Sequence, residues 1–220
     1  MNAAVLFLAA IGAVVLWWLA QQRLTAKPWL EAGTLGDLPD PESSEPAAKI
    51  GLWVFLAVVG SLFALLISAY FMRMEMGEWK PAPAPKILWL NTGLLVLSSI
   101  ALQWARRAAW RRNMEGVRAG LLAASVLAIA FLIGQFFAWR QLDAAGYFLV
   151  GNAAAAFFYL ITGVHGLHVI GGLVALGRTM NKAWQDYRVD PIRLSVELCA
   201  TYWHFLLFVW LILFAVLLHR

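Results

Sequence analysis

Four ionisable side chains interrupt the two apolar runs nearest the C-terminus of the sequence. His165 and His168 lie in one run, and Glu197 and His204 lie in the next. Glu197 is the only one of the twelve acidic residues inside an apolar run. Histidine and glutamate can ligate a metal or haem iron, carry protons, or join helices by hydrogen bonds. Each of these uses requires a partner, because an unpaired polar group in an apolar environment is costly.

Helical spacing places these residues on two helix faces. The first face recurs every three residues and consists of Thr162, His165 and His168. The second follows an i, i+4, i+7 pattern and consists of Glu197, Thr201 and His204. In consecutive antiparallel helices, His168 and His204 would lie at nearly the same depth, about 15 Å from the connecting loop. We therefore expect an intramembrane polar cluster in which Glu197 shares a hydrogen bond with at least one of the histidines.

Three interpretations of this cluster are open: a structural hydrogen-bond cluster, a proton or lipid-headgroup role, and a haem or metal site. Small residues surround the histidines, namely Gly163, Gly166, Gly171 and Gly172. They would let two helix backbones approach closely, which leaves little room for a macrocycle. His165 and His168 point the same way and cannot bind one haem from both sides, and a zinc or copper site needs three or four converging ligands. The structural interpretation is favoured, and we expect no catalytic, cofactor-binding or metal-ligating residue in this chain.

A second polar stripe falls in another apolar run. Asn91 and Thr92 are followed seven residues later by Ser98 and Ser99, a spacing that selects one helix face. No charged residue accompanies them. Packing against a neighbouring helix is therefore a better interpretation than the lining of a pore.

The composition requires lipid as the solvent of most of the chain. Apolar residues make up 62% of the 220 residues and charged residues 13%, whereas soluble domains are about 45–50% apolar and about 25% charged. Basic residues lie in short loops rather than on a face with exposed aromatic residues, so nucleic-acid binding is not expected. Six apolar stretches are long enough to cross a hydrocarbon core of roughly 30 Å; they are residues 3–20, 50–72, 87–105, 119–138, 148–177 and 194–218.

These stretches predict an all-α integral membrane protein with six transmembrane helices, one N-terminal helix and a five-helix bundle. All eight prolines lie between the stretches, which agrees with helices that keep their backbone hydrogen bonds internal. Residues 1–20 are expected to be a retained helix, since Trp17 and Trp18 occupy the place where a signal peptide has small residues. The polar, proline-rich segment 21–47 is expected to be a linker, and residues 48–220 the five-helix domain.

Basic residues are distributed unevenly between the two sides of the membrane. With the N-terminus outside, the inner loops carry 12 of the 17 Lys and Arg residues. The outer segments carry the other five, which are Arg73, Lys80, Lys86, Arg140 and Arg220. The positive-inside rule favours this arrangement. We expect a multi-pass protein of a bacterial-type inner (plasma) membrane, with the linker and the basic loops on the cytoplasmic side.

Four motifs within residues 48–220 form a recognisable set. The first is the segment TGVHGLHVIGG, which begins at Thr162. The second is Glu197 together with YWHF, which begins at Tyr202, and VW, which begins at Val209. The third is LNT, which begins at Leu90, together with Ser98 and Ser99, and the fourth is KIGLWVFL, which begins at Lys49. The first two resemble the signatures of the penultimate and last helices of subunit III of the haem-copper respiratory oxidases. The other two resemble a third motif of that family and the start of its conserved core.

The resemblance implies a non-catalytic subunit III of a haem-copper terminal oxidase of the cytochrome c oxidase type. Haem and copper would reside in subunits I and II. This chain would pack against subunit I, bind phospholipid in a cleft between its helices, and support sustained O2 reduction and proton translocation in aerobic respiration. Two carboxylates that many family members carry are missing. The chain has Val58-Val59-Gly60 where such members have a glutamate, and Leu207 where they have an aspartate.

Other functions are compatible with parts of the same pattern. Subunit III-like proteins that accompany nitric oxide reductases share these motifs. A free-standing b-type cytochrome would use His168 and His204, and a small transporter would use Glu197. A transporter usually shows broken helices or paired halves, and the sequence has neither feature.

Overall fold

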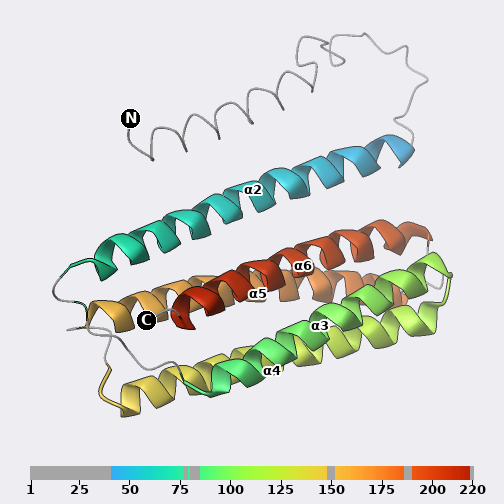
Figure 1. Ribbon diagram of the computed structural model, residues 1–220. Coiled ribbons are helices and arrows are strands. Elements are labelled where there is room, and N and C mark those ends of the chain that lie inside the picture. Colours follow the sequence, from blue (N-terminus) through green and yellow to red (C-terminus); the bar gives the residue numbers. More distant parts are fainter. Residues whose placement is uncertain (1–40, 77–78, 80–84, 148–151, 186–189, 219–220) are drawn as a thin grey trace, which may run out of the picture. The chain divides into compact units, whose positions relative to one another are not determined.

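The computed structural model describes residues 41–76, 79, 85–147, 152–185 and 190–218. Within these ranges it contains five α-helices, each long and apolar enough to cross a membrane. They are α2 (Pro41–Met74), α3 (Ile87–Trp110), α4 (Met114–Ala144), α5 (Ala153–Gln185) and α6 (Asp190–Leu218) (Figure 1). The all-helical fold and the last five predicted spans are therefore confirmed. The span predicted for residues 1–20 lies outside the described residues, as does most of the predicted linker.

The start of α2 differs from the prediction. The linker was expected to reach residue 47, but the helix already begins at Pro41. Proline is well suited to the first helical position, because the N–H group that it lacks would have no partner there. The proline-rich composition of this segment therefore marks a helix start as well as a linker.

A three-residue turn joins α3 and α4 into a close hairpin. Arg112 adopts a left-handed conformation with φ of 54°, and Asn113 caps α4 by accepting a hydrogen bond from the backbone N–H of Gly116 at 3.1 Å. The two helices are in close contact along their length. A Cβ atom at Gly120 would lie only 2.7 Å from the Cβ of Ala105. Glycine is required here by the approach of the two backbones.

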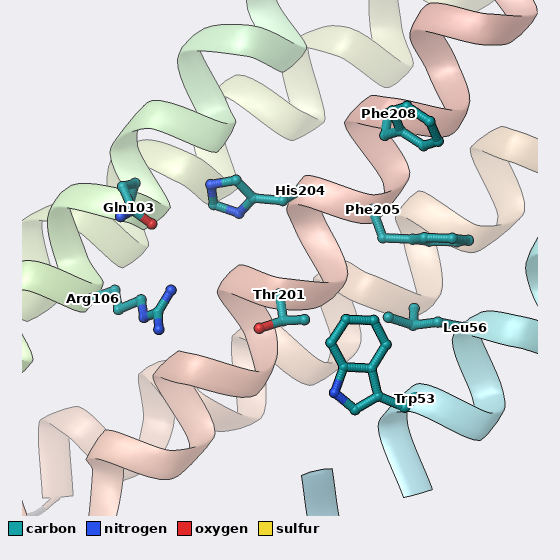
Figure 2. A pocket seen from close by; sticks show the side chains of 8 residues that line it. All are labelled: Trp53, Leu56, Gln103, Arg106, Thr201, His204, Phe205 and Phe208. Atoms are coloured by element: carbon teal, nitrogen blue, oxygen red, sulfur yellow. The ribbon is translucent and has the colours of Figure 1, made fainter. Parts of the chain in front are cut away.

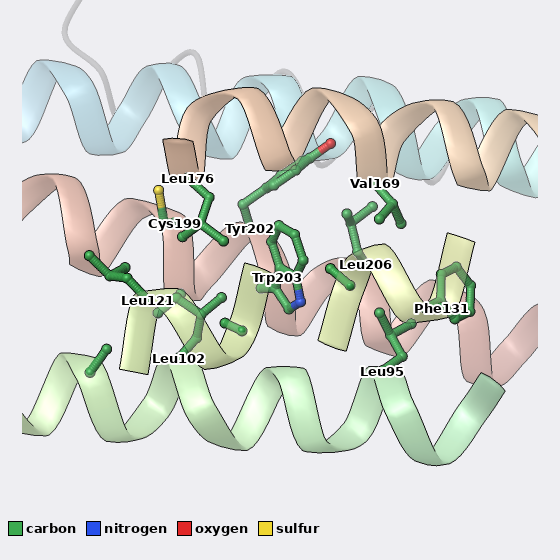
Figure 3. Close-up of a cluster of buried hydrophobic side chains, with 14 of the residues drawn as sticks. Leu95, Leu102, Leu121, Phe131, Val169, Leu176, Cys199, Tyr202, Trp203 and Leu206 are labelled. Atoms are coloured by element: carbon green, nitrogen blue, oxygen red, sulfur yellow. The ribbon is translucent and has the colours of Figure 1, made fainter. Parts of the chain in front are cut away.

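Helices α3 to α6 lie side by side and enclose the main apolar core (Figure 1). Trp203 of α6 is fully buried at its centre, among Leu102 of α3, Leu121 of α4 and Leu176 of α5 (Figure 3). Large apolar side chains also cover the outside of these helices, as at Ile129, which is 49% exposed. Such a surface is suited to lipid.

Helix α2 contacts α5 and α6 through aromatic side chains. The ring of Phe55 lies 6.0 Å from that of Tyr202, and the ring of Phe63 lies 5.4 Å from that of His168. Most of the rest of α2 is exposed, including Leu65, which is 69% accessible. This helix therefore offers a broad apolar face to lipid or to another protein.

Candidate functional site: polar groups within the helix bundle

Glu197 of α6 forms ion pairs with two other helices. Its Oε1 lies 3.2 Å from Nη2 of Arg106 on α3, and its Oε2 lies 3.6 Å from Nζ of Lys49 on α2. The carboxylate side chain is 21% exposed, and the two cations are each more than a third exposed. These three residues define what we call the basic end of the bundle. Their ion pairs connect α2, α3 and α6 at this end.

The expected hydrogen bond between Glu197 and a histidine is therefore wrong. Glu197 precedes His204 by seven residues, which is about 10 Å along a helix. The long side chains of lysine and arginine can reach a carboxylate from neighbouring helices while their stems cover apolar surface. Thr201, on the same face, uses its hydroxyl to donate to the backbone oxygen of Glu197 at 3.0 Å.

His165 lies in the core and is enclosed by aromatic rings. It is fully buried, and its ring centroid lies 5.0 Å from that of Trp210, 5.9 Å from that of Phe131 and 6.1 Å from that of Phe63. Neither ring nitrogen has a hydrogen-bond partner among the described residues. These surroundings bring together α2, α4, α5 and α6.

The other two histidines occupy different surroundings. Nδ1 of His168 lies 2.8 Å from the backbone oxygen of Val164, so this nitrogen carries the proton and donates. Nδ1 of His204 similarly contacts the backbone oxygen of Ala200, and its ring is exposed. Each imidazole thus bonds to its own helix. Within the described ranges, no three His, Cys, Asp or Glu side chains form a group suited to a metal ion.

A pocket of about 530 Å³ opens beside His204, between α2, α3 and α6 (Figure 2). One part of its wall is polar and contains Gln103, Arg106 and His204. The rest is largely apolar and includes Trp53, Leu56, Thr201, Phe205 and Phe208. A guanidinium at one side and aromatic rings at the other would suit an amphiphilic ligand with an anionic group.

The polar stripe of α3 contacts both neighbouring helices. Ser98 and Thr92 accept hydrogen bonds from the indole nitrogens of Trp203 and Trp210 on α6, at 2.9 and 3.0 Å. Asn91 donates from Nδ2 to Oε1 of Gln135 on α4 at 3.3 Å. Ser99 is also buried. These contacts fix the register between α3, α4 and α6.

Another tryptophan, Trp139 of α4, forms the same kind of contact with α5. Trp139 lies near the end of its span, as a residue of an interfacial aromatic belt would. Its indole nitrogen instead lies 3.0 Å from the hydroxyl oxygen of Thr162, which connects α4 to α5. Thr162 in turn donates to the backbone oxygen of Phe158 at 2.6 Å.

Sequence reasoning did not identify several partners of these groups. They are Lys49, Arg106, Gln135, Trp203 and Trp210. One signal was available, because Trp203 and Trp210 are seven residues apart and share a helix face, like Asn91 and Ser98. The pairing of Glu197 with two helices distant in sequence left no comparable local signal.

One family match covers α3 to α6 and the part of α2 from residue 45 onward. A sequence model of cytochrome c oxidase subunit III matches residues 45–219. The chain belongs to the cytochrome c oxidase subunit III family. The buried polar contacts around Thr92, Ser98, Thr162 and Trp203 therefore lie in the part of the chain that defines a subunit III. Subunit III is a non-catalytic accessory subunit of a haem-copper oxidase complex, and the chain is a multi-pass membrane protein.

Relatives from distant organisms show the same similarity. The chain is 31% identical over 175 residues to a probable cytochrome c oxidase subunit 3 of Mycobacterium bovis, covering 77% of this chain and 86% of the relative. It is 32% identical over 173 residues to the cytochrome c oxidase subunit 3 of Thermostichus vulcanus, covering 76% and 85%. The cytochrome c oxidase subunit 3 of Yarrowia lipolytica is 30% identical over 171 residues, covering 75% of this chain and 62% of the relative.

The segment Val58-Val59-Gly60, which contains no carboxylate, places one apolar side chain in the interior. Val59 is 3% exposed and belongs to a small core cluster with Phe63, Ile161 and Val209. At Val59 this subunit III therefore packs hydrocarbon against α5 and α6.

Proposed function

We propose that this subunit III packs against subunit I of a cytochrome c oxidase and supports its sustained O2 reduction and proton translocation in aerobic respiration. Subunits I and II would hold the haem and copper, and this chain would hold phospholipid. Membership of the subunit III family supports the accessory role. The pocket beside Arg106 is the observation that favours phospholipid binding by this chain.

We place the protein in a bacterial-type inner membrane, with the basic end at the cytoplasmic surface and the N-terminus outside. Support comes from the concentration of basic residues near that end. Arg106 and Arg107 lie near the C-terminal end of α3, Arg111 and Arg112 lie in the turn that follows it, and Arg118 lies near the start of α4. Lys and Arg near the ends of short spans favour the cytoplasmic side. The N-terminal part of this proposal concerns residues outside the described ranges.

The charge of the basic end suits a phosphate group. Glu197 provides one negative charge, and Arg106 and Lys49 provide two positive charges. The ion pair engages one terminal nitrogen of Arg106, whereas a guanidinium has five N–H donors in all. Arg106 also lines the pocket. A lipid phosphate could therefore bind Arg106 without displacing Glu197.

The opposite part of the pocket suits an acyl chain. Phe205 and Leu56 line it, and Trp53 and Phe208 extend the apolar surface outward, at 63% and 61% exposure (Figure 2). Burying hydrocarbon against such side chains is favourable by about 0.8 kcal/mol per CH2 relative to water, although a lipid already in a bilayer gains far less. The phosphate contact, rather than the acyl chain, would therefore select a particular lipid site.

Three variants of the intact complex test the lipid site. Arg106→Gln removes the guanidinium, and Arg107→Gln is the matched control, because Arg107 is exposed and does not line the pocket. Glu197→Gln breaks the ion pair but keeps Arg106. Native mass spectrometry of the purified oxidase should show loss of one phospholipid in Arg106→Gln only. Loss in Glu197→Gln as well would show that lipid retention does not depend on the guanidinium alone, and unchanged lipid in Arg106→Gln would contradict the site.

A further inference from the structure

Four buried side-chain atoms lack a hydrogen-bond partner within the described residues. They are Oδ1 of Asn91, Nε2 of Gln135 and both ring nitrogens of His165. The exposed fractions of these three side chains are 0%, 3% and 0%. Buried polar groups are nearly always bonded to protein or to ordered water. The unpaired atoms therefore need a ligand.

The three side chains belong to one layer of the bundle. Asn91 of α3 bonds to Gln135 of α4, and the residue after Asn91, Thr92, accepts from the indole of Trp210 on α6. The Trp210 ring in turn lies 5.0 Å from the ring of His165 on α5. Contacts thus lead from the amide pair to the imidazole through three helix interfaces.

Phe131 of α4 contacts both of the rings named above, Trp210 and His165. Its ring lies 5.0 Å from that of Trp210 and 5.9 Å from that of His165. Phe131 precedes Gln135 by one helical turn, and both belong to the buried face of α4. The amide of Gln135 and the imidazole of His165 therefore lie in the same section of the interior.

The unpaired atoms offer both donors and acceptors. Nε2 of Gln135 donates and Oδ1 of Asn91 accepts, while a neutral imidazole has one donor and one acceptor nitrogen. Exchanging the oxygen and nitrogen of both amides leaves the same inventory of one free donor and one free acceptor. A metal ion would find few suitable ligands here, and an apolar ligand would satisfy none of these atoms. Water donates and accepts, and buried water typically makes about three hydrogen bonds.

We propose that this layer is an internal hydration site, in which ordered water bonds to Asn91, Gln135 and His165. The two nitrogens of an imidazole ring point in different directions, so a single water cannot serve both. The site therefore holds at least two water molecules, one of which joins His165 to the amide pair. It links α3, α4 and α5 through polar contacts.

Gly134 makes room for the amide of Asn91. A Cβ atom at this position would lie 3.0 Å from Cγ and 3.4 Å from Nδ2 of Asn91, and closer still to Oδ1. A larger residue at position 134 would therefore displace the amide that binds the water. Gly171 provides a matched control, because no atom of the described residues lies within 4 Å of a Cβ built there.

Hydroxyl-radical footprinting of the intact oxidase complex tests the proposal. X-ray radiolysis converts bound water to radicals that modify the side chains beside it. Trp210 and Trp203 are matched probes, since both are fully buried on α6 and both indoles bond to a hydroxyl of α3. Trp210 should be modified several-fold faster than Trp203. Equal rates at the two residues would overturn the proposal without the need for a variant.

Two further results decide the role of the named residues. In Gly134→Ala the modification of Trp210 should fall toward that of Trp203, whereas Gly171→Ala should leave it unchanged. Persistence of fast Trp210 modification in an assembled Gly134→Ala complex would contradict a site built on Asn91. A density map of the complex that resolves water should show peaks bonded to Asn91, Gln135 and His165. An amide pair closed by two mutual bonds, with no peak at His165, would also overturn the proposal.

Discussion

The indole nitrogen of Trp203 lies 2.9 Å from the hydroxyl oxygen of Ser98, and through Ser98 this contact belongs to a pair of hydrogen bonds that connects three helices. Ser98 accepts from the indole of α6 and donates to the backbone oxygen of Ala124 on α4, also at 2.9 Å. A hydroxyl can fill both roles at once. Thr92 similarly accepts from Trp210 and donates to the backbone oxygen of Leu88 at 2.8 Å. Paired tryptophans and hydroxyls thus hold α6 in register with α3.

Ser98→Ala should destabilise the bundle by about 1 kcal/mol, since intramembrane polar contacts average ~0.6 kcal/mol and an orphaned buried donor costs ~1–3 kcal/mol. The measurement is the thermal stability of the purified complex. Ser68→Ala is the control, because Ser68 is exposed on α2. A double-mutant cycle with Trp203→Phe should give a coupling energy near 0.6 kcal/mol. Additive effects of the two changes would mean that the hydrogen bond contributes nothing.

Gly120→Val should lower the yield of assembled complex, whereas Gly93→Val should not. Both changes replace a helical glycine by valine and so have the same intrinsic effect on helix stability. A difference in yield between the two variants therefore reports the cost of the packing clash. A Cβ at Gly120 would lie 2.7 Å from the Cβ of Ala105 and 3.0 Å from the backbone oxygen of Ala101. At Gly93, no atom in the described part of the chain lies within 4 Å of such a Cβ. Overpacking of this kind typically costs about 1–3 kcal/mol. Equal yields of the two variants in detergent extracts would show that α3 and α4 can separate without loss.

Glu197→Ala should have a small effect and Glu197→Lys a large one. Removing the carboxylate leaves Arg106 and Lys49 partly exposed, so water and headgroups can compensate, and exposed ion pairs are worth about 0–1 kcal/mol. A third cation between them would be repelled. Yield and melting temperature of the complex measure both effects. Glu115→Lys, at an exposed position in the first turn of α4, is the charge-matched control. Equal losses in Glu197→Lys and Glu115→Lys would argue against a local ion-pair network.

The chain purified without its partners should show no Soret absorption. The ring of His165 is surrounded by Phe63, Phe131 and Trp210, and the imidazoles of His168 and His204 bond to their own helices in separate surroundings. Paired axial ligation of one haem would require these side chains to converge. A stoichiometric Soret band on the isolated chain, stable to washing, would support the cytochrome alternative.

The sequence predicted the helices because lipid imposes a simple rule on them. Runs of about 20 apolar residues must be helical to satisfy their backbone groups. The predicted spans therefore match α3 to α6, and their ends lie within several residues of the helix ends in the structure. The start of α2 at Pro41 was missed because proline serves both as a helix breaker and as a first helical residue.

The partners of the polar residues were harder to predict. Periodicity showed that Glu197 and His204 share a face, but not which neighbouring helix that face meets. The pairing of Glu197 with Lys49 and Arg106 depends on the relative rotation and depth of three helices. Packing sets those quantities, and no local pattern in the sequence records them. The isolation of His165 among aromatic rings arose in the same way.

The partners of this chain test most directly whether it serves as subunit III of an oxidase. The full chain should be affinity-tagged, expressed from its native locus and extracted in mild detergent. We predict that subunits I and II co-purify with it in equal amounts, and that the preparation shows haem absorption and consumes O2. Deletion of the gene should reduce the number of turnovers that each haem completes before the oxidase loses activity. Recovery of the chain with a nitric oxide reductase, or without any haem-copper subunit, would contradict the account.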